Sequence, residues 1–142
     1  NAIAQPDVEL YMDALLDWFQ NFNAGSLQKL QDFYTEDCYF RDPFNEAHNR
    51  EQLHALFTDM LKLQDLRFVI LERIQQGQKA FITWDFHFKI MGKAQCIHGG
   101  SLMTFADDGR VKSHVDYWDA AEGVYEKLPV FGALVRLVKR LF

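Results

Sequence analysis

The stretch FRDPFNE, residues 40–46, places one carboxylate, Asp42, between two aromatic residues and directly before a proline. A carboxylate held in an apolar pocket can give or take protons as a general acid or base. Asp-Pro is equally a common turn signal. The stretch alone fits both roles, so the elements around it must decide which one Asp42 has.

A second group of side chains suited to proton transfer lies in the segment 111–119, VKSHVDYWD. In a strand, His114, Asp116 and Trp118 share one face because side chains alternate between the two faces. Both faces are of mixed polarity, so two interpretations stay open. The three residues either lie on the half-solvated exterior of a sheet or converge in a pocket, where they would form an acid/base set.

Three helices and a short strand precede this segment. Apolar residues recur with the helical period after Asp7, after Ser26 and after Asn49, and each of these residues can cap the helix that follows it. A strand over residues 38–41 is stopped by Pro43. Asp42 therefore follows a strand directly, and the third helix begins a few residues later.

From residue 66 the apolar positions alternate with a period of two. This pattern predicts four long antiparallel strands, joined by short hairpin turns, over residues 66–74, 79–90, 94–105 and 111–119. The pair Gly99-Gly100 predicts a bend or bulge. Helices followed by a strand meander are typical of an α+β fold. A strongly curved antiparallel sheet, closed on one side by three N-terminal helices, would form a cone with an apolar interior.

Alternation within residues 79–90 also predicts which side chains face that interior. The aromatic face carries Trp84, Phe86 and Phe88, and the opposite, solvent-facing side carries Asp85, His87 and Lys89.

Composition narrows the class of protein. A chain of 142 residues suits one domain, 1–142, and its 13 phenylalanines can fill a core or line an apolar cavity. The net charge of −5 argues against a nucleic-acid partner, because phosphate binding needs a basic surface. No membrane span or signal peptide is visible, and Cys38 and Cys96 are expected as reduced, buried thiols, which favours a cytoplasmic protein.

Motifs for cofactors are missing from the sequence. It contains no glycine-rich phosphate loop and no Cys-x-x-Cys, and His48 and His54 are not spaced to share one helix face. The sequence therefore predicts no cofactor and no metal site.

The order of the elements resembles the nuclear transport factor 2-like superfamily, which includes ketosteroid isomerases and SnoaL-like polyketide cyclases. RDPF followed by NREQLHALF is similar to an Asp-Pro-Phe segment and the helix after it in ketosteroid isomerase. FADDGRVKSHVDYW resembles a later hairpin and strand of that enzyme. The resemblance covers about residues 8–119 and implies the cone fold, a hydrophobic small-molecule ligand and a homodimer formed through the outer face of the sheet.

The resemblance also implies roles for single residues. Asp42 falls on the general base of the isomerase, while Trp18 and Ser101 stand where that enzyme has the tyrosine and aspartic acid of its oxyanion hole. Asp116 falls on an acid/base carboxylate of SnoaL-like cyclases, and His114 turns inward beside it. The implied catalytic residues are Asp42, His114 and Asp116, and the implied substrate-binding residues are Trp18, Trp84, Phe86, Ser101, Met103 and Trp118.

Residues 128–142 extend beyond the resemblance and predict an extra C-terminal helix with basic residues near its end. Such a helix packs over the mouth of the cone or against a partner subunit. The alternative is an apolar-basic helix that makes peripheral contact with a membrane. The first interpretation is favoured, because packed amphipathic helices are far commoner.

Two functions fit these observations. The first is cofactor-independent acid/base chemistry, by an isomerase, aldol cyclase or dehydratase, on a hydrophobic small molecule in the cone. The second is a non-catalytic module that binds a small ligand or acts as a dimeric adaptor. Buried carboxylates with shifted pKa values around a cavity would favour the enzyme, and a filled cone would favour the adaptor.

Overall fold

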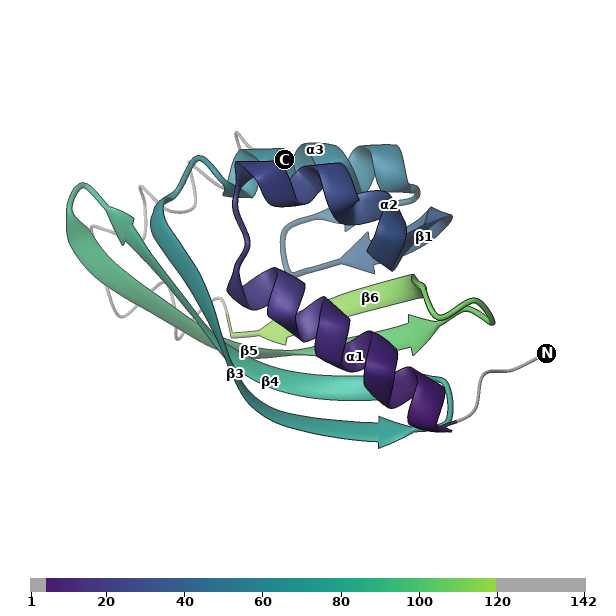
Figure 1. Cartoon of the computed structure of the whole chain (residues 1–142). Helices are drawn as coiled ribbons and strands as arrows, with labels where there is room; N and C mark the ends of the chain where they lie inside the picture. The colour runs from purple at the N-terminus through teal and green to yellow at the C-terminus, as the bar shows by residue number, and fades with distance from the viewer. Residues whose placement is uncertain (1–4, 120–142) are drawn as a thin grey trace.

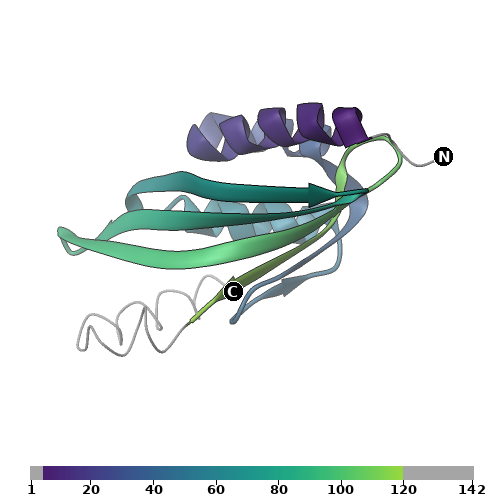
Figure 2. The ribbon, with the colours of Figure 1, turned by 90° about the horizontal axis from the view of Figure 1, so that it is seen from below.

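The computed structural model of the chain describes residues 5–119, which form helices packed on one face of a curved sheet (Figures 1 and 2). The helices are α1 (Gln5–Gln20), the short 3-10 helix η1 (Ala24–Lys29), α2 (Leu30–Phe33) and α3 (Arg50–Met60). The strands are β1 (Tyr34–Arg41), β2 (Glu46–Ala47), β3 (Gln64–Gln76), β4 (Lys79–Ile90), β5 (Lys93–Phe105) and β6 (Val111–Trp118). The predicted α+β architecture is confirmed.

Hydrogen bonds between capping side chains and nearby backbone amides mark where the helices begin. α3 begins as predicted, because the side chain of Asn49 accepts the amide hydrogen of Gln52 at 2.8 Å. The second helix begins earlier than predicted, since its cap is Asn23 and not Ser26. Ser26 instead accepts the amide hydrogen of Asn23 at 3.0 Å, which completes a capping box. α1 begins at Gln5, two residues before its predicted cap.

The six strands form one sheet in the order β2-β1-β6-β5-β4-β3. Strands β3 to β6 make the predicted antiparallel meander. Strand β1 pairs with β6 in parallel, so the sheet is mixed and not wholly antiparallel. This pairing brings the segment after β1 beside the last strand, although the two lie about 75 residues apart in sequence.

Of the bend or bulge predicted at Gly99-Gly100, the bulge does not form. Both glycines pair with β4 and with β6 in unbroken register, and the register shifts on the meander lie within β3 and near the start of β6. Gly99 instead allows the backbone of β6 and the ring of Trp84 to lie close to β5. A Cβ atom there would lie 2.7 Å from the carbonyl oxygen of Tyr117 and 2.8 Å from the ring of Trp84.

The predicted faces of β4 are confirmed. Trp84, Phe86 and Phe88 are buried in the core, while Asp85 and His87 on the opposite face are partly exposed. Cys38 is buried and Cys96 is half-buried, and neither is part of a disulfide. Among residues 5–119, no helix combines the length and the apolarity that spanning a bilayer requires. The predicted C-terminal helix lies outside the described residues.

Candidate functional site

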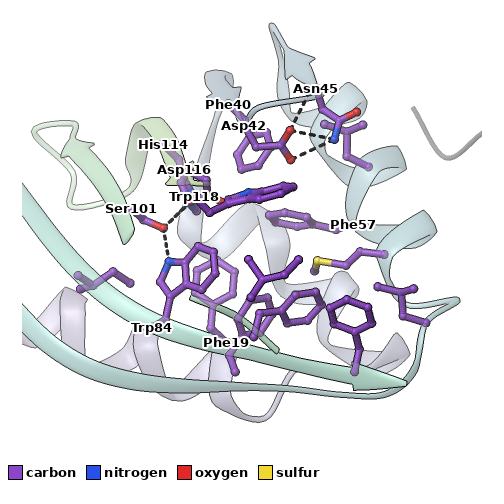
Figure 3. Close-up of a pocket in the computed structure, with 18 of the residues that line it drawn as sticks. Phe19, Phe40, Asp42, Asn45, Phe57, Trp84, Ser101, His114, Asp116 and Trp118 are labelled. Atoms are coloured by element: carbon purple, nitrogen blue, oxygen red, sulfur yellow. Dashed lines mark hydrogen bonds and ion pairs between the residues drawn. The ribbon is translucent and has the colours of Figure 1, made fainter. Parts of the chain in front are cut away.

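A cavity lies between the inner face of the sheet and helices α1 and α3 (Figure 3). Its walls are aromatic and aliphatic side chains from α1, α3 and strands β1 and β3 to β6. The polar side chains that line it are Asp42, Asn45, Ser101, His114 and Asp116. The cavity has a volume of about 110 Å³. An engineered apolar cavity of ~150 Å³ binds benzene, so this one suits a compact molecule or one end of a larger one.

Strand register brings Ser101 and Asp116 together, since they face each other across the β5–β6 ladder. The Ser101 hydroxyl donates to Oδ1 of Asp116. On its other side, the indole N–H of Trp84 donates to the Ser101 oxygen at 2.8 Å (Figure 3). Because an indole nitrogen can only donate, the serine oxygen must accept from Trp84 and its proton is left for Asp116.

His114 is buried and joins the same network. Its Nε2 lies 2.6 Å from Oδ1 of Asp116, and its Nδ1 lies 2.7 Å from the hydroxyl of Tyr34. A carboxylate can only accept, so we assign the ring hydrogen to Nε2. Nδ1 then accepts from Tyr34, and a neutral imidazole satisfies both nitrogens. Burial raises the pKa of Tyr34 well above its ordinary value, which keeps this phenol a donor.

All of these hydrogen bonds lead to one oxygen of Asp116. Oδ1 accepts from Ser101 and from His114, and the side chain is 18% exposed at the cavity wall. No hydrogen bond within the described part of the chain reaches Oδ2 of this carboxylate. Asp116 is therefore held as an oriented carboxylate, and this network uses only one of its two oxygens.

Asp42 has both of the roles that its sequence allows, because it stabilises a turn and also lines the cavity. Its Oδ1 accepts the backbone amides of Phe44 at 2.8 Å and Asn45 at 2.7 Å, which fixes the turn after β1. The amide group of Asn45 also donates to both carboxylate oxygens at 3.0 Å (Figure 3). The same carboxylate lines the cavity.

The surroundings of Asp42 shift its pKa upward. Burial is the largest cause, and the negative charge of Asp116 adds to it. The hydrogen bonds from Asn45 and Phe44 act in the opposite direction but do not cancel the burial. The cavity therefore holds two carboxylates in unlike environments, of which Asp42 keeps its proton to a higher pH than an ordinary aspartate.

Most of the predicted site residues line the cavity. Besides the three candidate catalytic residues, these are Trp84, Phe86, Ser101 and Trp118. Two others do not line it. Trp18 donates its indole N–H to the carbonyl oxygen of Ser26 at 2.9 Å, and Met103 is fully buried in the core. Neither Trp18 nor Ser101 has a free donor for an oxyanion, because the Ser101 proton goes to Asp116.

Tyr34 and Asn45 contact the candidate catalytic residues, and the sequence did not reveal either of them. Tyr34 fits the apolar stripe of the predicted second helix, whereas it begins β1 in the structure. Its partnership with His114 spans 80 positions, so no local pattern indicates it. Asn45 lies in the turn that Asp42 favours, because an aspartate side chain commonly bonds the backbone two residues on, whereas no local pattern indicates the Asn45 side-chain contact.

Comparison with protein families finds the SnoaL-like domain over residues 15–114. The match spans most of the chain, and the protein belongs to this SnoaL-like family. The expected membership of the nuclear transport factor 2-like superfamily is confirmed. Comparison with curated protein sequences finds no match.

Solved structures share the fold at low sequence identity. A candidate SnoaL-like polyketide cyclase from Jannaschia sp. CCS1 has a TM-score of 0.72 at 14% identity, covering 86% of this chain and 94% of its own. An LEH-like epoxide hydrolase from M. tuberculosis has a TM-score of 0.71 at 17% identity, covering 92% and 96%. A Catenulispora acidiphila protein of ketosteroid isomerase-like fold, in complex with trimethylamine, has a TM-score of 0.68 at 14% identity, covering 78% and 88%. These likenesses establish the fold.

Proposed function

We propose that the protein catalyses cofactor-independent proton transfer on a compact, mainly apolar molecule bound in the cavity. The observation that carries this proposal is the pair of unlike carboxylates in one apolar cavity. Two hydrogen bonds orient the carboxylate of Asp116, while burial raises the pKa of Asp42. Two carboxyl groups in unlike environments, one of them with a raised pKa, are suited to the roles of base and acid.

In the proposed reaction, Oδ2 of Asp116 takes a proton from a carbon next to a carbonyl group. The electron pair of the broken C–H bond moves into the carbonyl, so that an enolate forms. Asp42, when it carries a proton, can donate a hydrogen bond to the enolate oxygen, a role that Trp18 and Ser101 cannot fill because their donors are engaged. Asp116 then returns the proton to the same carbon or, in an isomerisation, to another carbon of the conjugated system.

His114 acts as a positioning residue in this scheme. It holds Oδ1 of Asp116 while Tyr34 holds the imidazole. The surrounding walls are mainly apolar, and an apolar environment strengthens electrostatic interactions inside the cavity. Aldol cyclisation and dehydration use the same first step, removal of a proton beside a carbonyl, so the site suits this group of reactions as a whole.

The proposal is tested with 3-cyclohexenone, a small β,γ-unsaturated ketone. Isomerisation to the conjugated ketone and deuterium exchange next to the carbonyl are both followed by NMR. We expect wild-type protein to accelerate both, and Asp116→Asn to lower the rate on the order of 10²–10⁴-fold, the usual contribution of a general base. The control is Asp32→Asn, which removes an exposed carboxylate on α2 and should keep the wild-type rate.

Rates in wild type no higher than in Asp116→Asn would contradict the proposal. Binding of the ketone at the cavity without exchange or isomerisation would instead support the alternative, a non-catalytic ligand-binding module. The homodimer, the cytoplasmic location and a contact of the C-terminal segment with a membrane remain predictions.

A further inference from the structure

Four side chains that commonly bind metals meet on the outer face of the sheet, across β4 and β5. In this antiparallel ladder His87 pairs directly with Cys96, and Asp85 pairs directly with His98. The two pairs are neighbours on one face, because residues two apart in a strand point the same way. Directly opposite Cβ atoms in such ladders are about 4.5–5.5 Å apart, so the four side chains form a compact square.

Three of these side chains already lie close to metal-binding geometry. One ligand atom each from Asp85, His87 and Cys96 lies within 4.8 Å of the others. Zinc binds nitrogen, oxygen and sulfur at about 2.0–2.3 Å, which places two tetrahedral ligands roughly 3.3–3.8 Å apart. Side-chain rotations that move each atom by about 1 Å would close the site around an ion.

The fourth side chain, His98, holds the Asp85 carboxylate. Its Nδ1 lies 2.7 Å from Oδ1 of Asp85, which leaves Oδ2 for an ion. Hydrogen-bonded partners of this kind orient metal ligands and raise their affinity. All three ligand residues are partly exposed in the single chain, so an ion can reach them there from solvent.

We propose that Asp85, His87 and Cys96 bind one divalent transition-metal ion, preferentially Zn²⁺, with water in the remaining coordination position. A thiolate together with an imidazole selects this class of ion over Mg²⁺ or Ca²⁺, which prefer oxygen ligands. The charges of a thiolate and a carboxylate balance the two charges of the ion. The site lies on the face opposite the cavity, which is lined by the intervening residues Trp84, Phe86 and Ile97.

Two cations lie beside this square of side chains. Arg67 pairs with His87 across the β3–β4 ladder, and Lys89 follows on the same face in an ion pair with Asp65 at 3.2 Å. Lys89 is thereby partly neutralised, whereas the exposed Arg67 repels a metal ion. Arg67→Ala should consequently tighten metal binding.

The test is a titration of the full-length, reduced protein with Co²⁺, followed by competition with Zn²⁺. We expect one Co²⁺ per chain, visible d–d bands of a tetrahedral site and a thiolate-to-cobalt charge-transfer band, all displaced by Zn²⁺. Cys96→Ser should remove the charge-transfer band, and His87→Ala should abolish tight binding. His98→Ala should weaken the affinity about 10–100-fold, as loss of a ligand-orienting partner does.

Two control variants locate the ion. His54→Ala removes an exposed histidine of α3, and Asp116→Asn removes one of the two cavity carboxylates; both variants should bind Co²⁺ like wild type. Unfolding curves without metal establish that each variant is folded. A charge-transfer band that is absent from wild type or persists in Cys96→Ser would overturn the proposal, and so would an affinity that depends on Asp116 but not on His87.

Discussion

Around Asp116, the direction of each hydrogen bond follows from what its partners can donate. The indole of Trp84 has no acceptor, so Ser101 must accept from it and donate onward to the carboxylate. In the same way, the hydroxyl of Tyr34 donates to Nδ1 of His114, which leaves Nε2 to donate to the carboxylate. A chain of donors that ends on one oxygen orients the carboxylate without consuming its other oxygen. This is the arrangement that a fixed general base requires.

Removing the hydroxyl of Tyr34 should therefore cost stability. In Tyr34→Phe the buried Nδ1 of His114 loses its donor, and an unsatisfied buried polar atom costs about 1–3 kcal/mol. We expect a decrease of that size in the free energy of unfolding, measured with urea. The ketone reaction should also slow, because the imidazole that holds Asp116 is no longer fixed.

The matched control is Tyr39→Phe, which removes a hydroxyl bonded to Glu46 at an exposed position. Surface changes of this kind usually alter stability by less than about 0.5 kcal/mol. Equal costs for the two variants would show that the contact between Tyr34 and His114 is not a buried, structure-determining hydrogen bond.

Among the strands, close packing at one glycine sets the shape of the site. Gly99 pairs with Trp84 on one side and with Trp118 on the other, and both indoles line the cavity. The missing side chain lets the Trp84 ring lie across β5, where its N–H reaches Ser101 two residues further on. The spacing of β4, β5 and β6 at this point is thus tied to the position of the donors.

A methyl group at this glycine should disturb the site. In Gly99→Ala the new Cβ would meet a backbone carbonyl at 2.7 Å and Trp118 Cβ at 2.9 Å, neither of which can easily move. We expect a loss of about 1–3 kcal/mol in unfolding free energy, as for other overpacked positions. Tryptophan fluorescence should change as well, because both cavity indoles are displaced.

Gly100→Ala is the neighbouring comparison. Its nearest contact would be the tip of the Phe81 ring, which is 36% exposed and can rotate away, and the nearest backbone atom, the carbonyl oxygen of Ile82, would lie at 3.0 Å compared with 2.7 Å at Gly99. The expected cost is smaller than at Gly99. A larger loss at Gly100 than at Gly99 would contradict the packing argument.

The sequence alone predicted the overall architecture because its patterns are local. Alternation in β4 correctly separated Trp84 and Phe86 from Asp85 and His87, and Asn49 correctly marked the start of α3. The inward direction of His114 did not follow from its strand, whose two faces are both mixed. It followed from the family resemblance.

What the sequence could not predict depends on contacts between distant segments. The parallel pairing of β1 with β6 brings Asp42 to the cavity that holds Asp116, and no hairpin signal encodes such a pairing. The hydrogen bond between Tyr34 and His114 and the one from the Trp18 indole to Ser26 also depend on the folded arrangement, and no local pattern predicts them. The square of His87, Cys96, Asp85 and His98 likewise becomes visible only through the register of two strands.

The whole molecule therefore brings two carboxylates from separate segments into one apolar cavity. The central expectation is that the charge of Asp116 raises the pKa of Asp42. Carboxyl ¹³C NMR measures it directly, by titrating Asp42 in wild type and in Asp116→Asn. We expect the pKa of Asp42 in wild type to lie above its ordinary value of 3.8, because burial and the charge of Asp116 both raise it. In Asp116→Asn the pKa should fall, since the neighbouring negative charge is gone, while burial keeps it raised. An Asp42 that titrates at its ordinary value, and does so equally in both proteins, would contradict the account.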